Sequence, residues 1–446
     1  MNLDDALQEI EHMHSYQIYG EVTSLSGLSV TVAMSTRTMC VGARCSIEGL
    51  DEHYIDAEVV GFCGNSAQLM VFGDLAQIRP GCRVVMSDEE GAYIYPDNSW
   101  CGRIINGLGE AFDEKGPLKK GDLPMPLKAS PPPAHKRAPV EERIDTGVRA
   151  INTFLTMCKG QRMGIFAGSG VGKTMLLSMM IKYAQCDVVV IGLIGERGRE
   201  LHDFIEKAVG RDNLKKCVLV VSTSDETALM RKQAAYTAMT VAEYFRNQGK
   251  SVLCVMDSVT RFAMAQREIG LSCGEPPASK GYTPSVFAEL PKLLERAGPG
   301  PQHEGLQTGY ITAVFTVLVD GDDHNEPVAD AVRGILDGHI VLDRSIAARN
   351  HYPAINILNS ISRTVPGCHD GAERKVVSKA RGILATYNDM ADMIRIGAYK
   401  KGSSTVVDEA VSKIEDLDKF TSQSFDDGDT LASSFDKLSK VLGEPL

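Results

Sequence analysis

The sequence predicts an α/β protein, in which a core built on a parallel sheet lies between a small N-terminal β-barrel and a C-terminal helical domain. Three observations predict it. Short alternating apolar runs with frequent glycines fill residues 16–90, apolar runs alternate with helical segments through residues 91–365, and helical spacing dominates residues 366–446. Because a domain commonly holds roughly 150 residues, the 446-residue chain has the length for about three domains.

Residues 1–15 are predicted to form a short amphipathic helix, because apolar residues recur there at helical spacing. These residues are Leu3, Leu7 and Ile10. From about Tyr16 the spacing changes to alternation, as in the run from Leu28 to Val32. Frequent glycines indicate turns between short strands, and regularly spaced short strands are typical of a small β-barrel.

The stretch Ser130–Arg137 holds three successive prolines, which favour an extended connector between domains. Beyond it, apolar runs are typical of strands buried on both faces of a sheet. These runs are Gly164–Phe166, Val188–Ile194, Val218–Val221, Val252–Met256 and Ile311–Leu318. The helical segments between them are Lys173–Ala184, Leu201–Ala208 and Ala228–Phe245. This alternation indicates a parallel sheet with helical connections.

Helical spacing continues to the C-terminus, with helices predicted over Glu373–Ile396 and Val406–Phe420. A tail follows, with apolar residues Leu431, Phe435, Leu438 and Leu442. The sequence leaves open whether the tail from Ser424 onward is ordered.

The chain has a net charge of −11, which argues against a sequence-independent nucleic-acid binder that neutralises phosphates. The start of the sequence lacks the features of a signal peptide, and no apolar stretch has the length of a membrane span, so the cytoplasm is the expected compartment. Eleven scattered cysteines without a C-x-x-C pair indicate neither a disulfide framework nor a zinc site. The adjacent Cys368 and His369 favour a structural role over a metal site, because no second pair accompanies them.

A phosphate-binding loop is predicted between an apolar run and a helical one. Its residues are Gly168, Ser169, Gly170, Val171, Gly172, Lys173 and Thr174. Glycines let the backbone wrap a phosphate, and the amides at the helix N-terminus supply positive potential. Lys173 adds a charge at the β and γ phosphates, and Thr174 is a Mg²⁺ ligand. The strict G-x-x-x-x-G-K-S/T pattern wants glycine where this chain has Ala167.

Two carboxylates follow apolar strands. Asp257 ends the run from Val252, and an acid at that place in P-loop enzymes holds the Mg²⁺ shell. Glu196 follows the strand that ends at Ile194, where a carboxylate can orient the water that attacks the γ-phosphate. The alternatives are a solvated turn for Asp257 and a charged helix cap for Glu196.

The phosphate-binding loop and the two carboxylate motifs, in this order and with these residues, resemble the catalytic-subunit family of rotary F- and V-type ATPases and their secretion relatives. The likeness runs over nearly the whole chain, from Gly102-Arg103 through Thr146–Ile151 to the C-terminal helices. The segment Gly281–Gly298 is similar to the type III protein export branch. The sequences of Ala347–Ser360 and of Arg395–Gly402 favour the flagellar export ATPases over virulence secretion ATPases, which remain the alternative.

The resemblance implies a RecA-like P-loop NTPase core that hydrolyses ATP with Mg²⁺. It assigns Lys173 and Thr174 to phosphate and metal, Glu196 to the attacking water, and Asp257 to the Mg²⁺ shell. Family members of this branch tend to have alanine at the position of Ala167, so that departure casts no doubt on nucleotide binding.

The resemblance also implies two roles that the residues alone would not indicate. Arg363 matches the arginine finger, which reaches the γ-phosphate bound to a neighbouring subunit and contributes roughly 10³ to 10⁵ in rate. Tyr352 matches the aromatic residue that packs on adenine. Asn152 stands where relatives often have aspartate, and the sequence does not say what that changes.

As an assembly, the family likeness implies a homohexamer whose N-terminal domains close one face, with residues 271–280 facing the pore. The turn Gly397–Gly402 would contact a coiled-coil central stalk protein, and the N-terminal helix would bind a dimeric regulator. Export chaperones and a membrane export gate are the further partners implied. The expected location is therefore cytoplasmic, peripherally associated with the inner membrane at the export apparatus.

Two other functions compete with the export ATPase. A nucleotide-gated subunit with little hydrolysis is disfavoured by the intact set Lys173, Thr174, Glu196 and Asp257. A hexameric RNA translocase would need exposed aromatic and basic residues in the barrel, and residues 16–90 supply few of them. No nucleic-acid partner is expected.

Overall fold

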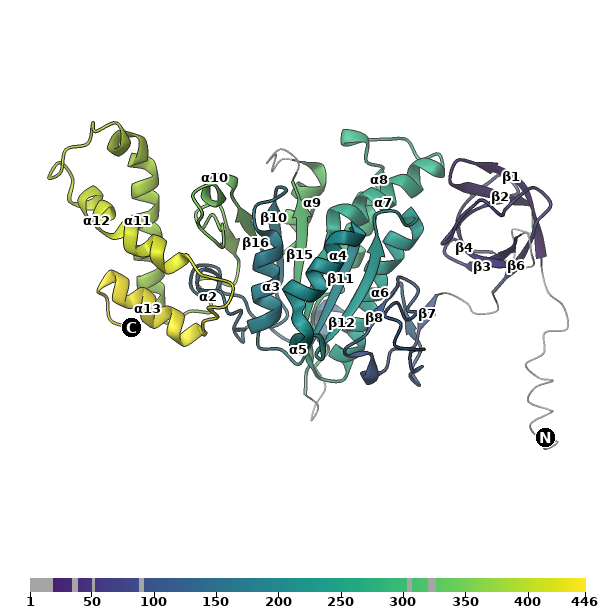
Figure 1. Cartoon of the computed structure of the whole chain (residues 1–446), viewed down its shortest axis with the longest axis horizontal. Helices are drawn as coiled ribbons and strands as arrows, with labels where there is room; N and C mark the ends of the chain where they lie inside the picture. The colour runs from purple at the N-terminus through teal and green to yellow at the C-terminus, as the bar shows by residue number, and fades with distance from the viewer. Residues whose placement is uncertain (1–18, 34–38, 50–52, 88–91, 303–306, 320–325) are drawn as a thin grey trace.

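The computed structural model describes residues 19–33, 39–49, 53–87, 92–302, 307–319 and 326–446. The barrel lies at one end of the molecule, the sheet and its helices in the middle, and the last three helices at the other end (Figure 1). The fold class predicted from the sequence is confirmed. The predicted N-terminal helix lies outside the described residues.

Six antiparallel strands close the N-terminal barrel in the order β1-β2-β5-β4-β3-β6. Their bounds are β1 Tyr19–Ser26, β2 Ser29–Ala33, β3 Arg44–Glu48, β4 Tyr54–Cys63, β5 Ser66–Val71 and β6 Arg83–Met86. Side chains alternate along each strand, so one set fills the interior. That interior includes Val22, Val30, Val32, Ile47, Val59 and Leu69, all buried. The alternation seen in the sequence therefore gives the barrel its core.

The central sheet has the strand order β17-β16-β10-β15-β13-β11-β12-β8, and β14 pairs with β15. The long strands are parallel neighbours. Bounds are β8 Ile104–Ile105, β10 Arg162–Ala167, β11 Val188–Glu196, β12 Cys217–Thr223, β13 Ser251–Asp257, β14 Gly298–Pro299, β15 Tyr310–Leu318, β16 Gly338–Leu342 and β17 Ile361–Ser362. A separate two-stranded ribbon joins β7 Tyr93–Ile94 to β9 Met125–Pro126.

Helices cover both faces of this sheet. Ile165 faces a core shared with α2 and α3, whereas its neighbour Phe166 faces the core formed with α6 to α9. Bounds are α2 Arg149–Phe154, α3 Lys173–Tyr183, α4 Gly198–Asp203, α5 Gly210–Leu214, α6 Ala228–Asn247, α7 Val259–Ser272, α8 Pro284–Leu294, α9 Pro327–Ile335 and α10 Arg344–Ala347. Short 3-10 turns are η3 Asn98–Trp100, η4 Ala134–Lys136 and η6 Ser279–Gly281. Burial on both faces explains why the strands are almost entirely apolar.

The helix predicted over Leu201–Ala208 is divided in the structure. An α-helical turn, α4, runs into a π-helical segment, η5 Phe204–Val209, before α5 begins. Segments with π-helical hydrogen bonding occur often at functional sites. This one borders the site described below.

Three helices form the C-terminal domain: α11 Gly371–Arg395, α12 Thr405–Thr421 and α13 Leu431–Leu442. Asp370 begins α11 with a capping box, in which its carboxylate accepts from the Glu373 amide and the Glu373 side chain accepts from the Asp370 amide. Phe435, Leu438 and Leu442 of α13 are buried in the core shared with α2 and α11. The tail, whose order the sequence left open, is thus a packed helix.

Contacts hold the barrel and the connector against the core. Lys128 Nζ lies 2.8 Å from Glu58 Oε1 of β4, and the connector residue Arg137 donates to the Glu295 carbonyl oxygen at 2.7 Å. Within the described part of the chain, no helix is long and apolar enough to cross a membrane.

Candidate active site

The predicted phosphate-binding loop connects the end of β10 to the start of α3. Gly170 and Gly172 have φ angles of +77° and +94°, which residues with a side chain rarely adopt. Ala167, by contrast, is the last residue of β10 and is fully buried. Its place in the strand needs no glycine conformation, which explains why alanine is tolerated there.

A pocket of about 520 Å³ opens beside this loop. The loop and the first turn of α3 form one wall, and the carboxyl ends of β11, β13 and β15 contribute to the others. Of the predicted residues it is lined by Gly168, Ser169, Gly170, Gly172, Lys173, Thr174, Glu196 and Asp257. Val171 is buried beneath the loop in the adjoining core. The structure therefore brings the predicted phosphate, metal and water residues into one cavity.

Lys173 faces both carboxylates of the pocket. Its Nζ lies 2.5 Å from Asp257 Oδ1 and 3.8 Å from Glu196 Oε1. Burial disfavours the charged ammonium, but the two carboxylates outweigh burial and raise the pKa of Lys173. A nucleotide phosphate that enters the pocket would therefore compete with Asp257 for this ammonium group.

Glu196 ends β11 and lines the pocket. Burial, with repulsion from Asp257 and Glu200, raises the pKa of Glu196 to about 7 against the opposing attraction of Lys173. A carboxylate with a pKa near 7 is suited to accept a proton from water at neutral pH.

This pKa predicts a pH dependence. Protonated Glu196 cannot act as a base, so kcat/KM for ATP is expected to fall about tenfold per pH unit below pH 7, since kcat/KM reports the free enzyme. Glu200→Gln removes a group that raises the pKa, so the acid limb should move to lower pH. A pH–rate series on both proteins measures the limb, and an unshifted limb in Glu200→Gln would contradict the assignment.

Asp257 is held by the neighbouring strand β15 as well as by Lys173. Thr316 Oγ1 of β15 donates to Asp257 Oδ1 at 2.7 Å, and the Asp257 side chain is almost fully buried. Because Thr316 is itself buried, it fixes the direction in which this carboxylate points. This contact was not predictable from the sequence, because it depends on β13 and β15 being neighbours.

Two arginines of the pocket were missed by sequence reasoning. Arg261 lies one helical turn beyond Asp257 on α7, and its buried Nε has no hydrogen-bond partner among the described residues. Arg197 directly follows Glu196 and is exposed. Guanidinium groups suit phosphate oxygens, so both add to the anion-binding character of the pocket. Their position just after the two carboxylates was the available signal.

Tyr352 lies against the loop. A Cβ built on Gly172 would stand 3.1 Å from the Tyr352 ring, so glycine permits the close approach. The Tyr352 carbonyl oxygen accepts from the Gln423 amide at 2.7 Å, which ties this segment to the residues that follow α12. The ring thus lies beside Gly172 of the loop, but it is not among the residues that line the pocket.

Arg363 is not brought to this pocket. It directly follows β17, its amide donates to the Asp337 carbonyl oxygen at 2.9 Å, and it lines a separate pocket of about 250 Å³ with Arg137 and Arg162. None of the loop residues line that pocket. Within one chain the predicted finger and the predicted phosphate site are therefore apart.

Comparison with known proteins gives matches over the core and over the C-terminal helices. Residues 147–362 match the ATP synthase alpha/beta family, nucleotide-binding domain, and residues 370–440 match the T3SS EscN ATPase C-terminal domain. The flagellum-specific ATP synthase of Caulobacter vibrioides is 54% identical over 97% of this chain and 98% of its own length. That of Bacillus subtilis is 46% identical over 99% of both chains.

The chain belongs to the flagellar type III export ATPase family. It is an ATPase of the ATP synthase alpha/beta class. The assembled ATPase EscN of the enteropathogenic E. coli type III secretion system has a similar fold, with a TM-score of 0.88 and 38% identity over 95% of this chain and 100% of EscN. The type 3 secretion system ATPase of Xanthomonas euvesicatoria is 42% identical over 95% of this chain and 93% of its own length. The comparisons therefore favour a flagellar export ATPase over a virulence secretion ATPase.

Asn152 has a structural role in this export ATPase. Its Oδ1 accepts from Thr146 Oγ1 at 2.7 Å, and its Nδ2 donates to Asp145 Oδ1 and to the Asp429 carbonyl oxygen, both at 3.1 Å. The amide thus joins the start of the tail, between α12 and α13, to the core. Arg149 reinforces the joint through the Phe420 carbonyl oxygen at 2.8 Å.

Asn152→Asp is expected to lower the free energy of unfolding by about 1–3 kcal/mol, because a buried carboxylate cannot donate and would face Asp145. Urea unfolding at neutral pH measures the change. The exposed Asn388→Asp serves as the matched control and should stay within about 0.5 kcal/mol. Equal free energies of unfolding for the two variants would show that the Asn152 amide does not contribute to stability.

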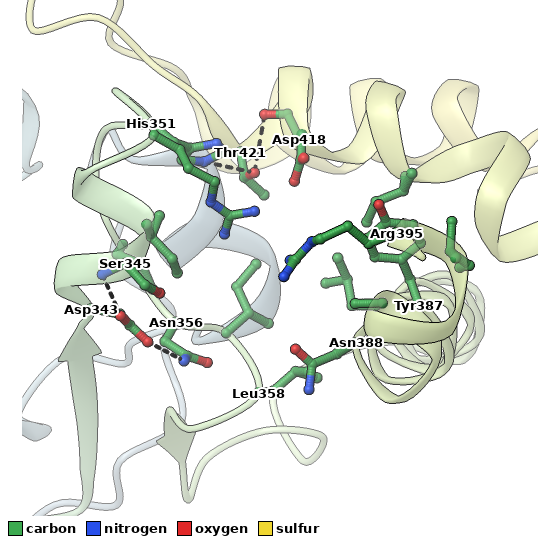
Figure 2. A pocket seen from close by; sticks show the side chains of 18 residues that line it. Asp343, Ser345, His351, Asn356, Leu358, Tyr387, Asn388, Arg395, Asp418 and Thr421 are labelled. Carbon is green, nitrogen blue, oxygen red and sulfur yellow. Dashed lines mark hydrogen bonds between the residues drawn. The ribbon is translucent and has the colours of Figure 1, made fainter. Parts of the chain in front are cut away.

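A second cavity, of about 600 Å³, separates the core of the export ATPase from its helical domain (Figure 2). Asp343, Ser345 and Asn356 line the core side, whereas Tyr387, Asn388 and Arg395 come from α11. At its edge His351 Nε2 lies 3.2 Å from Thr421 Oγ1 at the end of α12. The helical domain is thus bonded to the core at some points and separated from it at others.

Proposed function

We propose that this chain is one subunit of a homohexameric ring that hydrolyses Mg²⁺-ATP to energise export of flagellar proteins. The observation that carries the proposal is the separation of Arg363 from the pocket of Lys173 and Glu196. An arginine finger that serves a neighbouring subunit needs such a separation, because it must be presented outward from its own chain. Each site would then lie between two subunits.

Mg²⁺ is the proposed cofactor, and the donor set supports it. Thr174 and Asp257 present oxygen atoms at the loop and at the end of β13, and Mg²⁺ is commonly held by few protein oxygens together with waters and phosphates. When bound with ATP, the ion would neutralise phosphate charge. Lys173 would hold the β and γ phosphates, Glu196 would orient the attacking water, and Tyr352 would pack on adenine.

A coiled-coil central stalk protein is the proposed partner of the tip between α11 and α12. Met393 and Ile396 at the end of α11 and Val406 at the start of α12 are 46%, 73% and 60% exposed. They flank the turn Gly397–Gly402, which carries Lys400 and Lys401. The assembled EscN has a solved structure in complex with its central stalk EscO, and that complex, with a TM-score of 0.85 to this chain, supports the assignment.

The remaining partners follow from membership of the family. A dimeric regulator would bind the N-terminal helix. At the inner membrane, ATP hydrolysis by the ring would act on export chaperones and on the membrane export gate. Nucleic acid is not a proposed partner, and a filter-binding assay with single-stranded RNA would test that.

The ring is tested by measuring Mg²⁺-ATPase activity against protein concentration, with mass photometry on the same samples. Specific activity is expected to rise as hexamers appear, because each site needs a neighbour. Turnover that is independent of concentration and belongs to monomers would overturn the shared site. Gly172→Val, which should clash with the Tyr352 ring and block the loop, is the inactive reference at every concentration.

A further inference from the structure

Two cysteine thiols from distant parts of the chain meet beside the start of α11. Cys158 precedes β10 and is buried, whereas Cys368 lies in the turn between β17 and α11 and is partly exposed. The two thiols interact with each other, and the Cys158 thiol also donates to the Glu141 carbonyl oxygen at 3.7 Å. The ATPase chemistry proposed above uses neither of them.

Other bonds hold the two segments side by side independently of the thiols. Thr364 Oγ1 donates to the Thr156 carbonyl oxygen at 3.0 Å, and Thr156 Oγ1 pairs with His369 Nε2 at 2.7 Å. Ser362 Oγ donates to the same Thr156 carbonyl at 2.9 Å. These bonds hold the segment of Cys158 beside the segment of Cys368.

The imidazole of His369 supports the thiolate form of Cys368. This ring is buried, its Nδ1 finds no oxygen or nitrogen partner in the described residues, and it interacts with the Cys368 thiol. The hydrogen bond from Cys158, against the effect of burial, and the contact with His369 lower the pKa of Cys368. The same thiol pairing and burial raise the pKa of Cys158. One sulfur is thus a nucleophile, and its neighbour keeps its proton.

We propose that Cys368 is a hydroperoxide-reactive thiol and that Cys158 resolves its oxidised form as an intramolecular disulfide. In the first step the Cys368 thiolate attacks the peroxide, an S–O bond forms, the O–O bond breaks, and the alcohol or water leaves after protonation. In the second step Cys158 attacks the sulfenic sulfur, an S–S bond forms, and water leaves with the Cys158 proton. The peroxide gains the two electrons that the thiols lose.

The disulfide would have a mechanical effect that rests on the proposed function. It would tie the segment that follows Arg363, together with the start of α11, to the loop that precedes β10. Oxidised protein is therefore expected to bind ATP but to turn it over at least about tenfold more slowly, since the finger must be free to adjust to its neighbour.

The test treats the full-length protein with stoichiometric hydrogen peroxide at pH 7, then alkylates the remaining thiols and maps peptides by mass spectrometry. Cys368 is expected to react about tenfold faster than the exposed Cys63 of the same chain, because an ordinary thiol is mostly protonated at this pH. The product should be a peptide pair linked through Cys158 and Cys368. Dithiothreitol should restore both thiols.

Two variants separate the roles. Cys158→Ser should accumulate a sulfenic acid at Cys368 that dimedone traps, and Cys368→Ser should leave Cys158 reduced. Equal reaction of Cys63 and Cys368, or oxidation of Cys368 without the linked peptide, would overturn the proposal. The linkage is read by mass, so this result stands apart from the ring. A disulfide that leaves turnover unchanged would overturn only the effect on Arg363, whereas failure of the reduced protein to show ring-dependent turnover would concern the proposed function.

Discussion

Arg363→Ala is expected to lower kcat by about 10³-fold or more while ATP still binds, because the substitution removes the guanidinium that a neighbouring subunit would present to the γ-phosphate. Arg363 lies outside the pocket that holds Lys173, so its loss should leave the nucleotide affinity of each chain nearly unchanged. Steady-state turnover and equilibrium binding of a fluorescent ATP analogue measure the two quantities separately.

Arg211→Ala is the matched control, since Arg211 is an exposed arginine of α5 that lines neither pocket. A mixing experiment sharpens the test. Combining Arg363→Ala with Lys173→Ala subunits should restore partial activity, because one variant keeps the phosphate site and the other keeps the finger. If the mixture stays inactive while mixed rings form, Arg363 does not act between subunits.

Glu196→Gln is expected to reduce kcat by about 10²- to 10⁴-fold, because the amide keeps the size of the side chain and loses the ability to accept a proton from water. ATP affinity should be retained or increased, since the substitution also removes a negative charge 3.8 Å from Lys173. Single-turnover kinetics with preformed complexes distinguish a slow chemical step from slow binding.

For this second variant the neighbouring Glu200→Gln supplies the comparison. Glu200 lines the same pocket without ending a strand, so its replacement should change the pH profile more than the maximal rate. A Glu200→Gln enzyme as impaired as Glu196→Gln would mean that the catalytic carboxylate has been misassigned.

The parts of the fold that depend on local spacing were predictable. The long strands and the phosphate-binding loop have apolar runs and glycines that specify them in isolation, and they lie where the sequence placed them. The short β16 was missed because Gly338–Leu342 resembles a loop segment until β10 pairs with it. The π-helical Phe204–Val209 was missed because its composition is that of an ordinary helix.

The candidate site was predictable up to the carboxylates and no further. Lys173 and Asp257 lie in motifs, whereas Thr316 acquires its role only because β15 lies next to β13. Asn152 likewise gains its meaning from Asp429, which is far away in the sequence. Pairs of this kind follow from topology, and the exact domain bounds and the roles carried by the family likeness remain predictions.

The way in which the helical domain is attached has a mechanical consequence. Bonds from Arg149 and Asn152 fasten the residues from Phe420 to Asp429 to the core, while the second half of α11, from Leu384 to Arg395, lines the 600 Å³ cavity. A domain that is bonded to the core at one place and separated from it by a cavity at another can rotate about the bonded residues without breaking those bonds. With 25 residues, α11 is about 37 Å long, so a swing of about 10° would displace its far end by about 6 Å. Small closures beside Tyr352 would thus become large strokes at the tip that flanks Gly397–Gly402.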